Sequence, residues 1–294
     1  MKYRPFGKTG IEISAVSYGG IVSSGVHRSP TFPHENQQDS DRYVAFAIDR
    51  GINYFDVAPT YGNAQEQLGN SLVPYRSRIH LACKTLKRDR QGAEKELEES
   101  LRLLHTDHFD VYQLHQIESL EDVERAFAPG GVMELMDTLK SRGIANHIGF
   151  TAHNEDAALK MLELYPFESV LFPINWLMNM SRGMGNRLIA KAKELGIGLL
   201  AMKAFIERRW EENEDKGCFP KSWCKPIDPE FEPDFCKAAM RYTLALGVDT
   251  LIPPGNFKSF SFAADNIDDC IEHPEPDRAL LAEKFAQFKG KEFF

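Results

Sequence analysis

The sequence predicts an α/β protein built as a (β/α)8 TIM barrel, and three observations lead to this fold class. Eight short apolar runs alternate with eight segments of helical periodicity, and the composition does not shift along the chain. Eight parallel strands are also the number that closes such a barrel. An open doubly wound sheet is the alternative, but the first strand–helix turn, Tyr18-Gly-Gly-Ile-Val-Ser-Ser24, lacks the G-x-G-x-x-G dinucleotide fingerprint. We therefore expect residues 1–294 to form a single barrel domain.

The expected elements follow one another in a regular order. Residues 2–13 alternate around Gly7-Lys-Thr-Gly10, which predicts an N-terminal β-hairpin. The strand-like runs then lie at about 14–19, 53–58, 79–84, 109–115, 147–152, 169–175, 198–204 and 249–253. The helical segments lie at 39–50, 64–72, 92–105, 131–142, 154–165, 184–195, 234–246 and 258–267. Residues 275–291 predict an extra C-terminal helix packed outside the barrel.

Two long segments interrupt this rhythm. Ser23–Gln37 is a first loop rich in Ser, Pro and His, and Ile206–Pro233 is a long loop after the seventh strand. Loops longer than about 12–15 residues inside a compact domain are usually functional or disordered. In a barrel both would lie on the C-terminal face, where sites are built. The segment 206–233 is therefore a candidate lid over a bound cofactor.

Charge and composition exclude several classes of protein. The formal net charge is -8, and no Lys/Arg block offsets it, so we expect neither nucleic acid nor an anionic membrane as a partner. Residues 1–7 show no apolar signal segment, and no apolar run has the length of a membrane span. The five cysteines lack the spacing of a disulfide framework or a C-x2-C metal site. We expect a cytoplasmic protein without a metal, either a monomer or a weak homo-oligomer.

Four ionisable residues fall at the carboxyl ends of the second, third and fourth predicted strands. Asp56 lies inside an apolar run, Tyr61 follows on the next loop, and Lys84 and His115 end the next two runs. Neighbouring strand ends converge in a barrel, so these groups are expected in one pocket. Asp56 would hold Lys84 charged, and the ammonium would lower the pKa of the Tyr61 phenol. Tyr61 would then exchange a proton with a carbonyl or alcohol oxygen, while His115, as a neutral imidazole, orients that oxygen.

These residues lie in motifs that resemble those of the aldo-keto reductases. The resemblance is carried by Phe55-Asp-Val-Ala-Pro-Thr-Tyr-Gly62, by the strand end at Lys84 and by Tyr112-Gln-Leu-His115. It covers essentially the whole chain, as far as Pro253-Pro-Gly255 and Asp265-Asn266. It implies a (β/α)8 barrel, a nicotinamide cofactor bound without a Rossmann domain, and a catalytic tetrad of Asp56, Tyr61, Lys84 and His115. The variants Ile-Gly-Phe-Thr-x-His and Ala-Met-Lys resemble a bacterial branch of the family.

The resemblance also implies a set of cofactor contacts, with three departures from the family pattern. One is that the seventh strand, Leu199-Leu-Ala-Met-Lys-Ala-Phe205, lacks the Tyr that stacks on the nicotinamide. Gly149-Phe-Thr-Ala-His153 resembles the segment that holds the carboxamide, with Ala152 in place of an Asn. Leu171 stands where the family usually has a Gln. The cofactor-binding residues implied are Thr151, Asn175, Met202, Lys203, Pro254, Gly255, Asn256, Lys258, Asp265 and Asn266.

The phosphate end of the cofactor is expected at the start of the last barrel helix. Pro253-Pro-Gly-Asn-Phe-Lys-Ser259 follows the eighth strand, and backbone N–H groups at a helix N-terminus suit a phosphate. The family often places an Arg or Lys here for the 2′-phosphate of NADP. Phe262 occupies the position of the Arg, which leaves Lys258 as the nearby cation. We therefore expect NADPH as the cofactor, with NADH as the other candidate.

The function implied is NAD(P)H-dependent, reversible reduction of an aldehyde or ketone, with Tyr61 as general acid and base. The partner is then a small-molecule carbonyl or alcohol, with Tyr18, His153 and Trp176 as candidate substrate contacts. His153 is either such a contact or a satisfied loop histidine. Trp176, Trp210 and Trp223 either line the pocket or pin their loops. The alternative function is that of a nicotinamide-binding regulatory or sensor protein with little or no turnover. The replaced residues on the nicotinamide side of the site, Ala152 and Leu171, favour this alternative.

Overall fold

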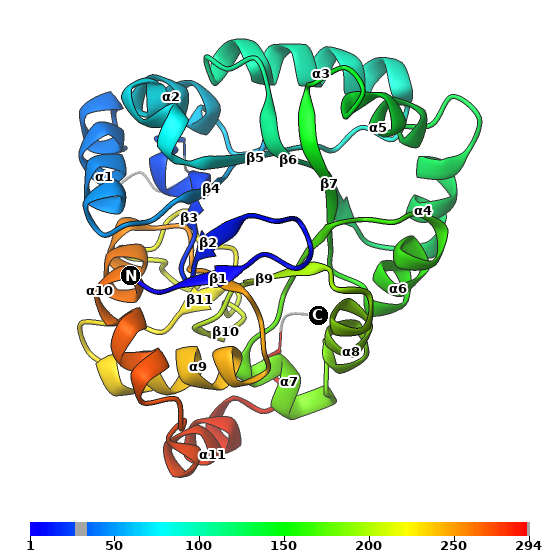
Figure 1. Ribbon diagram of the computed structural model, residues 1–294. Helices are drawn as coiled ribbons and strands as arrows, with labels where there is room; N and C mark the ends of the chain where they lie inside the picture. The colour runs from blue at the N-terminus through cyan, green and yellow to red at the C-terminus, as the bar shows by residue number, and fades with distance from the viewer. Residues whose placement is uncertain (27–33, 293–294) are drawn as a thin grey trace.

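The computed structural model describes residues 1–26 and 34–292. Within that part of the chain, eight parallel strands form one sheet that curves into the predicted barrel, with helices around it (Figure 1). A parallel bridge between Val16 and Leu251 joins the two ends of the sheet and closes the ring. The barrel strands are β3 (Tyr18–Gly19), β4 (Tyr54–Asp56), β5 (His80–Thr85), β6 (Phe109–Ile117), β7 (Ala145–Ala152), β8 (Ser169–Phe172), β9 (Gly198–Met202) and β12 (Thr250–Ile252).

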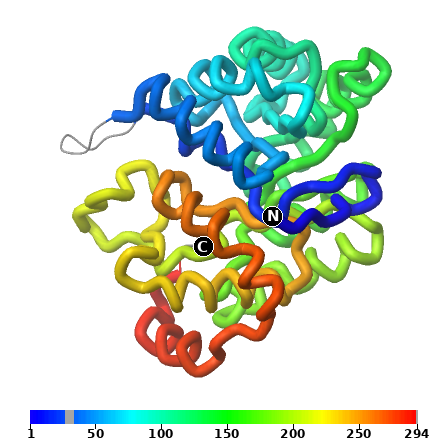
Figure 2. The backbone as a smooth tube through the Cα atoms, turned by 60° about the vertical axis from the view of Figure 1, so that its left-hand side comes forward, coloured from blue at the N-terminus to red at the C-terminus, as the bar shows by residue number. Residues whose placement is uncertain are grey.

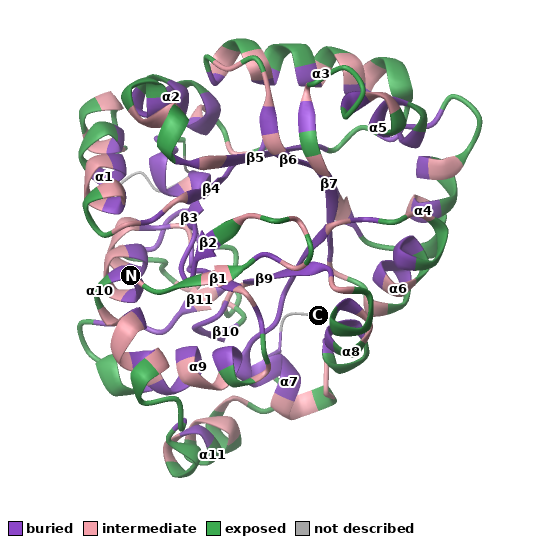
Figure 3. Ribbon diagram, viewed as in Figure 1, coloured by how far each residue is buried: buried purple, intermediate pink, exposed green. Residues whose placement is uncertain are grey.

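The helices pack their apolar faces on the outside of the barrel and expose their polar faces to solvent (Figure 3). Local sequence fixes several of their ends: the side chain of Asn36 caps α1, and Gly196 ends α8 with a φ of 69°. The α-helices are α1 (Gln37–Asp49), α2 (Ala64–Leu72), α3 (Arg90–Leu103), α4 (Leu120–Phe127), α5 (Met133–Leu139), α6 (Glu155–Leu164), α7 (Trp176–Arg182), α8 (Asn186–Leu195), α9 (Pro233–Ala245), α10 (Phe257–Glu272) and α11 (Arg278–Phe288). Two 3-10 helices, η1 (Gly20–Ser23) and η2 (Val73–Arg78), complete the set among the described residues.

Two short helices were not expected from the sequence. The first, α4, starts after Ser119, whose side chain accepts a hydrogen bond from the Asp122 amide, and this capping pattern was readable in the sequence. The second, α7, begins at Trp176, because the side chain of Asn175 caps it. The strand expected over 169–175 therefore ends at Phe172, where the chain turns toward this cap.

The long segment after β9 also differs from the expected irregular loop. It contains a two-stranded antiparallel sheet, β10 (Ile206–Arg208) with β11 (Lys225–Pro226). Within this segment, Arg208 of β10 pairs with Glu214 at 2.7 Å, and the Trp210 indole donates to the Ser222 carbonyl oxygen at 2.9 Å. The other long loop, expected over 23–37, lies partly outside the described residues, at 27–33.

The predicted N-terminal hairpin, β1 (Tyr3–Pro5) with β2 (Glu12–Ser14), covers the amino end of the barrel. Its turn inserts Phe6, which is fully buried and meets the Tyr54 ring at a centroid distance of 5.5 Å. Gly198 is required there, because a Cβ at that position would lie 2.4 Å from the Phe6 ring. Figure 2 shows the hairpin (dark blue) and the β10–β11 segment (yellow) on opposite sides of the molecule.

Carboxylates at the amino end hold adjacent strands in register. Each lies at the start of one strand and accepts a hydrogen bond from a backbone N–H of the strand before it. Asp110 accepts from Leu81 at 2.9 Å, Glu168 from Ile148 at 3.0 Å and Asp249 from Leu199 at 2.8 Å. The barrel core thus carries its charged residues at its two ends.

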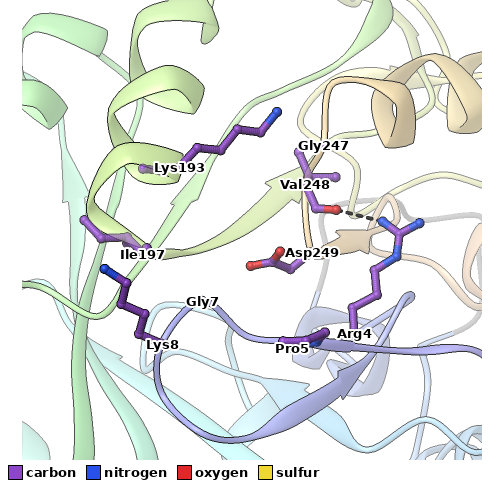
Figure 4. A pocket seen from close by; sticks show the side chains of 11 residues that line it. Arg4, Pro5, Gly7, Lys8, Lys193, Ile197, Gly247, Val248 and Asp249 are labelled. Atoms are coloured by element: carbon purple, nitrogen blue, oxygen red, sulfur yellow. Dashed lines mark hydrogen bonds between the residues drawn. The ribbon is translucent and has the colours of Figure 1, made fainter.

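A hollow of about 460 Å³ lies beside the hairpin at the amino ends of β9 and β12 (Figure 4). Two of its cationic side chains donate hydrogen bonds to backbone carbonyl oxygens. Arg4 donates to the Val248 carbonyl oxygen at 2.8 Å, and Lys193 donates to that of Leu246 at 3.0 Å. The Arg4 contact fastens the hairpin to the barrel, and the Lys193 contact joins α8 to the end of α9. No helix within the described ranges is long and apolar enough to cross a membrane.

Candidate active site

Asp56 and Lys84 form a buried ion pair at the carboxyl ends of β4 and β5. The Lys84 ammonium donates to an Asp56 carboxylate oxygen and, at 3.3 Å, to the Val57 carbonyl oxygen. Both side chains are almost completely enclosed, with 0% of Lys84 and 2% of Asp56 exposed. Burial raises the pKa of the Asp56 carboxyl, and the adjacent ammonium opposes this rise. Each charge therefore compensates the desolvation of the other.

Tyr61 lies beside this pair, on the loop that follows β4. The Lys84 Nζ atom is 5.9 Å from the centre of the Tyr61 ring. The expectation that Lys84 lowers the pKa of Tyr61 is nevertheless wrong for this structure. Burial raises the pKa of the phenol, and the negative charge of Asp56 raises it further. Tyr61 thus keeps its proton across the ordinary pH range.

His115 faces Tyr61 from the end of β6, with the two ring centres 5.9 Å apart and the planes at 84°. Burial lowers the pKa of His115 to about 3, and the charge of Lys84 acts in the same direction. The imidazole is therefore neutral at physiological pH. Its Nδ1 atom is buried and has no hydrogen-bond partner among the described residues.

Tyr61 and His115 line a cavity of about 590 Å³ at the carboxyl ends of the barrel strands. Other residues expected at the site join them there from β7, β9 and the turn after β12: Thr151, His153, Met202, Lys203, Pro254 and Gly255. The cavity thus connects the tyrosine–histidine pair with the N-terminus of α10. Asp56 and Lys84 lie just beneath it, behind Tyr61.

Two cavity residues hold a left-handed backbone conformation that is unusual outside glycine. Gln116 has a φ of 63° and Lys203 a φ of 64°. Such residues often mark functional sites, because the fold must compensate their local strain. The backbone N–H of Gln116 donates a hydrogen bond to the Thr151 hydroxyl at 2.7 Å, which fixes the end of β6 against β7. Burial lowers the pKa of Lys203, and it lowers the pKa of His153 to about 3.

Sequence reasoning named only Trp223 in one wall of the cavity. Gln116 and Glu118 follow the end of β6, and Lys221, Ser222, Trp223 and Cys224 come from the segment before β11. The position of the first two just beyond a strand end was a usable signal. Trp223 is one of the tryptophans considered for the pocket, and the structure places it there. Lys221, Ser222 and Cys224 could not be placed from the sequence, because their approach to the barrel depends on how a long segment folds.

The turn into α10 approaches η1 closely. A Cβ on Gly255 would lie 2.2 Å from the Cγ2 methyl of Ile21, so a larger residue would displace that side chain. The side chain of Asn256 caps α10 by accepting a hydrogen bond from the Ser259 amide at 2.8 Å. The Nδ2 atom of Asn256 is buried and has no hydrogen-bond partner among the described residues. This atom is therefore a neutral donor at the start of the helix.

Both aromatic residues expected to contact substrate lie in the core instead of the cavity. Tyr18 is fully buried, and its hydroxyl shares a 2.7 Å hydrogen bond with that of Ser23. Trp176 is also fully buried, and its indole donates to the Ile206 carbonyl oxygen at 2.8 Å. Trp176 thus anchors β10, and the tryptophan that lines the cavity is Trp223, which is 82% exposed.

Five residues expected at the cofactor do not line the cavity. Asn256 and Lys258 lie at the start of α10, and the other three are engaged elsewhere. Asn175 is buried as the cap of α7, and Asp265 pairs with Arg50 at 2.8 Å on the protein surface. Asn266 donates to the Phe262 carbonyl oxygen within α10 at 2.8 Å. Their side chains therefore stabilise helix ends and helix contacts in this structure.

The barrel and the cavity at its carboxyl ends define a class of protein. The sequence model of the Aldo/keto reductase family matches residues 25–220, more than half of the chain. The chain therefore belongs to this family, whose members are oxidoreductases that generally use nicotinamide cofactors and act on small molecules. The same finding confirms the resemblance inferred from the motifs around Asp56, Lys84 and His115.

Individual relatives agree with this assignment. The chain is similar to the Glycine max protein named Probable aldo-keto reductase 1, at 25% identity over 208 residues, 66% of this chain and 56% of the relative. It is 26% identical to aldo-keto reductase YhdN of Bacillus subtilis (strain 168) over 245 residues, 75% of this chain and 70% of the relative. The chain thus spans little more than half the length of the soybean protein.

A solved structure with the same fold is the holo form of aldo-keto reductase AKR11C1 from Bacillus halodurans. The likeness covers 100% of this chain and 98% of that one, with a TM-score of 0.69 and 19% sequence identity. At this identity the comparison shows the (β/α)8 fold alone.

Among the described residues, no group of three His, Cys, Asp or Glu side chains has an arrangement that would hold a metal ion.

Proposed function

We propose that the protein catalyses the reversible, NAD(P)H-dependent reduction of an aldehyde or ketone to an alcohol. One observation carries this proposal: Tyr61 and neutral His115 face one cavity, with the Lys84–Asp56 pair buried behind the tyrosine. The cavity also reaches Gly255 in the turn before α10, where the backbone N–H groups of a helix N-terminus suit a cofactor phosphate. All five cysteines are free thiols, which supports a cytoplasmic location.

In the proposed reaction, the cofactor and the side chains at the site have separate roles. A bound nicotinamide supplies the hydride, and the protein supplies orientation and proton transfer. His115, as a neutral imidazole, donates a hydrogen bond that orients the carbonyl oxygen of the substrate. Tyr61 keeps its proton until negative charge develops on that oxygen, and then transfers it. Lys84 stabilises the resulting tyrosinate, and Asp56 compensates the burial of the ammonium. His153 is proposed to contact the substrate, since it lines the same cavity.

The substitution Tyr61→Phe tests this proposal. Removal of the phenol proton is expected to lower kcat for carbonyl reduction by about 10²-fold or more, since general acid catalysis contributes this much. Binding of the reduced cofactor, measured by fluorescence titration, is expected to stay unchanged. Tyr75→Phe is the matched control, because Tyr75 lies in η2 and does not line the cavity.

The second candidate function is a nicotinamide-binding sensor or regulatory protein. It is favoured by Ala152 and Leu171, which replace the family's usual polar contacts to the nicotinamide side. A wild-type protein that binds the cofactor tightly but reduces no member of a broad carbonyl panel would support this function and reject the enzyme. A wild-type turnover that disappears in Tyr61→Phe supports the enzyme.

A further inference from the structure

Lys258, the residue expected to bind a 2′-phosphate, is already held by two carboxylates. It lies in the first turn of α10, three residues after cavity residue Gly255. Its ammonium is 2.6 Å from Asp228 Oδ1 and 2.7 Å from Glu230 Oε2. The two carboxylates flank one ammonium, so the three side chains together carry a net negative charge.

The contacts around this cluster hold it in place. The Glu230 amide donates to the Asp228 carboxylate at 3.0 Å, which fixes the two acids in one turn. The Lys258 ammonium also lies 5.8 Å and 5.6 Å from the ring centres of Phe219 and Phe231. Burial lowers the pKa of Lys258, but the hydrogen bonds from its ammonium to the two acids outweigh this and raise it. Lys258 therefore remains a charged partner of these acids.

The two lysines that line the cavity either bind other groups or lie away from the start of α10. Among the described residues that line it, the lysines are Lys203 and Lys221. Lys203 lies just beyond the end of β9, on the strand side of the cavity. The Lys221 ammonium is buried, and it binds Glu35 at 2.6 Å and two backbone carbonyl oxygens at 3.0 Å. Neither therefore adds a free positive charge at the start of α10.

We propose that this end of the cavity selects NADH over NADPH, with Asp228 and Glu230 as the specificity-determining residues. A 2′-phosphate carries a charge of about -1.5 to -2 and would meet carboxylates that already outnumber the single ammonium. A ribose 2′-hydroxyl instead donates a hydrogen bond to a carboxylate, which is how acidic residues favour NAD in other folds. The neutral Asn256 amide suits phosphate or hydroxyl oxygens alike. The inference rests on the proposed function, and it reverses the NADPH preference expected from Lys258.

Fluorescence titration of the wild-type protein with each reduced cofactor is the first test. NADH is expected to bind at least about tenfold more tightly than NADPH. In the double variant Asp228→Asn, Glu230→Gln, the freed Lys258 is expected to tighten NADPH binding about tenfold or more, with NADH binding changed less than about threefold. The isosteric side chains retain the turn, because Asn keeps the oxygen that accepts from the Glu230 amide. If this double variant unfolds, Glu230→Gln alone tests the same shift, since the Glu230 side chain is 65% exposed.

Two controls separate a local effect from a general change of charge. Glu275→Gln removes one exposed carboxylate before α11 and is expected to leave the NADPH/NADH ratio unchanged. Lys258→Met in the wild-type background is expected to leave NADPH binding no stronger. Tighter binding of NADPH than NADH by the wild type, lost in Lys258→Met, would overturn the inference while leaving the proposed function intact. Binding of neither cofactor would overturn both.

Discussion

Lys84 and Asp56 are the two charges that the fold encloses most completely at the site. Each charge offsets the desolvation cost of the other, because either one alone would be a buried, unpaired charge in a region that excludes water. The same pair sets the electrostatics of its neighbours: Lys84 favours a neutral His115, and Asp56 favours a protonated Tyr61. At the scale of single residues, the pair thus keeps Tyr61 protonated and His115 neutral, as the proposed function requires.

A double-mutant cycle tests how far the pair acts as a unit. Lys84→Met and Asp56→Asn are each expected to lower the free energy of unfolding by about 3–5 kcal/mol, because each leaves an uncompensated buried group. The double variant is expected to be less destabilised than the sum of the two, by at least about 1 kcal/mol. Urea unfolding measures all three, with Lys160→Met as the surface control. Strictly additive losses would show that the two side chains do not interact.

The β10–β11 segment is tied to the first loop of the barrel by one side chain. The Lys221 ammonium donates to the Val22 and Ser24 carbonyl oxygens, both at 3.0 Å, and to the Glu35 carboxylate. Its neighbours Ser222 and Trp223 line the cavity, so this contact positions the cavity wall. At the scale of elements, the candidate lid is a segment with a small sheet that is fixed to the first loop and forms one wall of the cavity.

Lys221→Met is expected to loosen this wall. We predict a cofactor dissociation rate about tenfold higher, because the methionine removes three hydrogen bonds but keeps most of the buried side-chain volume. Stopped-flow displacement of the reduced cofactor measures the rate directly. Lys216→Met is the control, since the Lys216 ammonium bonds to the Ser222 carbonyl oxygen within the same segment. Unchanged dissociation in Lys221→Met would reject the segment as a lid.

At the scale of the whole molecule, the amino-end carboxylates make stability depend on pH. Burial opposes ionisation of Glu168, but hydrogen bonds from His147, Lys140 and the Ile148 amide outweigh it and lower the pKa of Glu168 to about 2. Because this pKa lies below that of an unfolded glutamate, about 4.3, the carboxylate stabilises the fold above that pH. This contribution is lost as the pH falls from about 4.3 toward 2.

The variant Glu168→Gln tests that contribution. The free energy of unfolding of the wild type is expected to fall between pH 4.5 and 3 with an extra slope of up to about 1.4 kcal/mol per pH unit, which the variant lacks. Urea midpoints measured across this range give the slope. Glu163→Gln, which removes an exposed acid paired with Lys160, is expected to behave like the wild type. Identical slopes in all three proteins would contradict the assignment.

The sequence by itself determined the barrel and the order of the tetrad along it. Eight alternations of apolar runs and helical periodicity suffice for the fold, because each unit is set by local patterning and parallel strands need helical crossovers. Asp56 and Lys84 were found as polar residues at consecutive strand ends, which the topology must bring together. Their contact could therefore be predicted before their geometry was known.

Only the tertiary structure decided what surrounds the tetrad. Lys221 meets Val22 across 199 positions of sequence, and no local pattern encodes such a contact. The pairing of Lys258 with Asp228 and Glu230, and the placement of Trp176 in the core, likewise depend on how the segment after β9 folds. The direction of the Tyr61 pKa was decided in the same way, since burial is a property of the packed molecule. Strand ends follow from periodicity, whereas the walls and charges of the cavity follow from long-range packing.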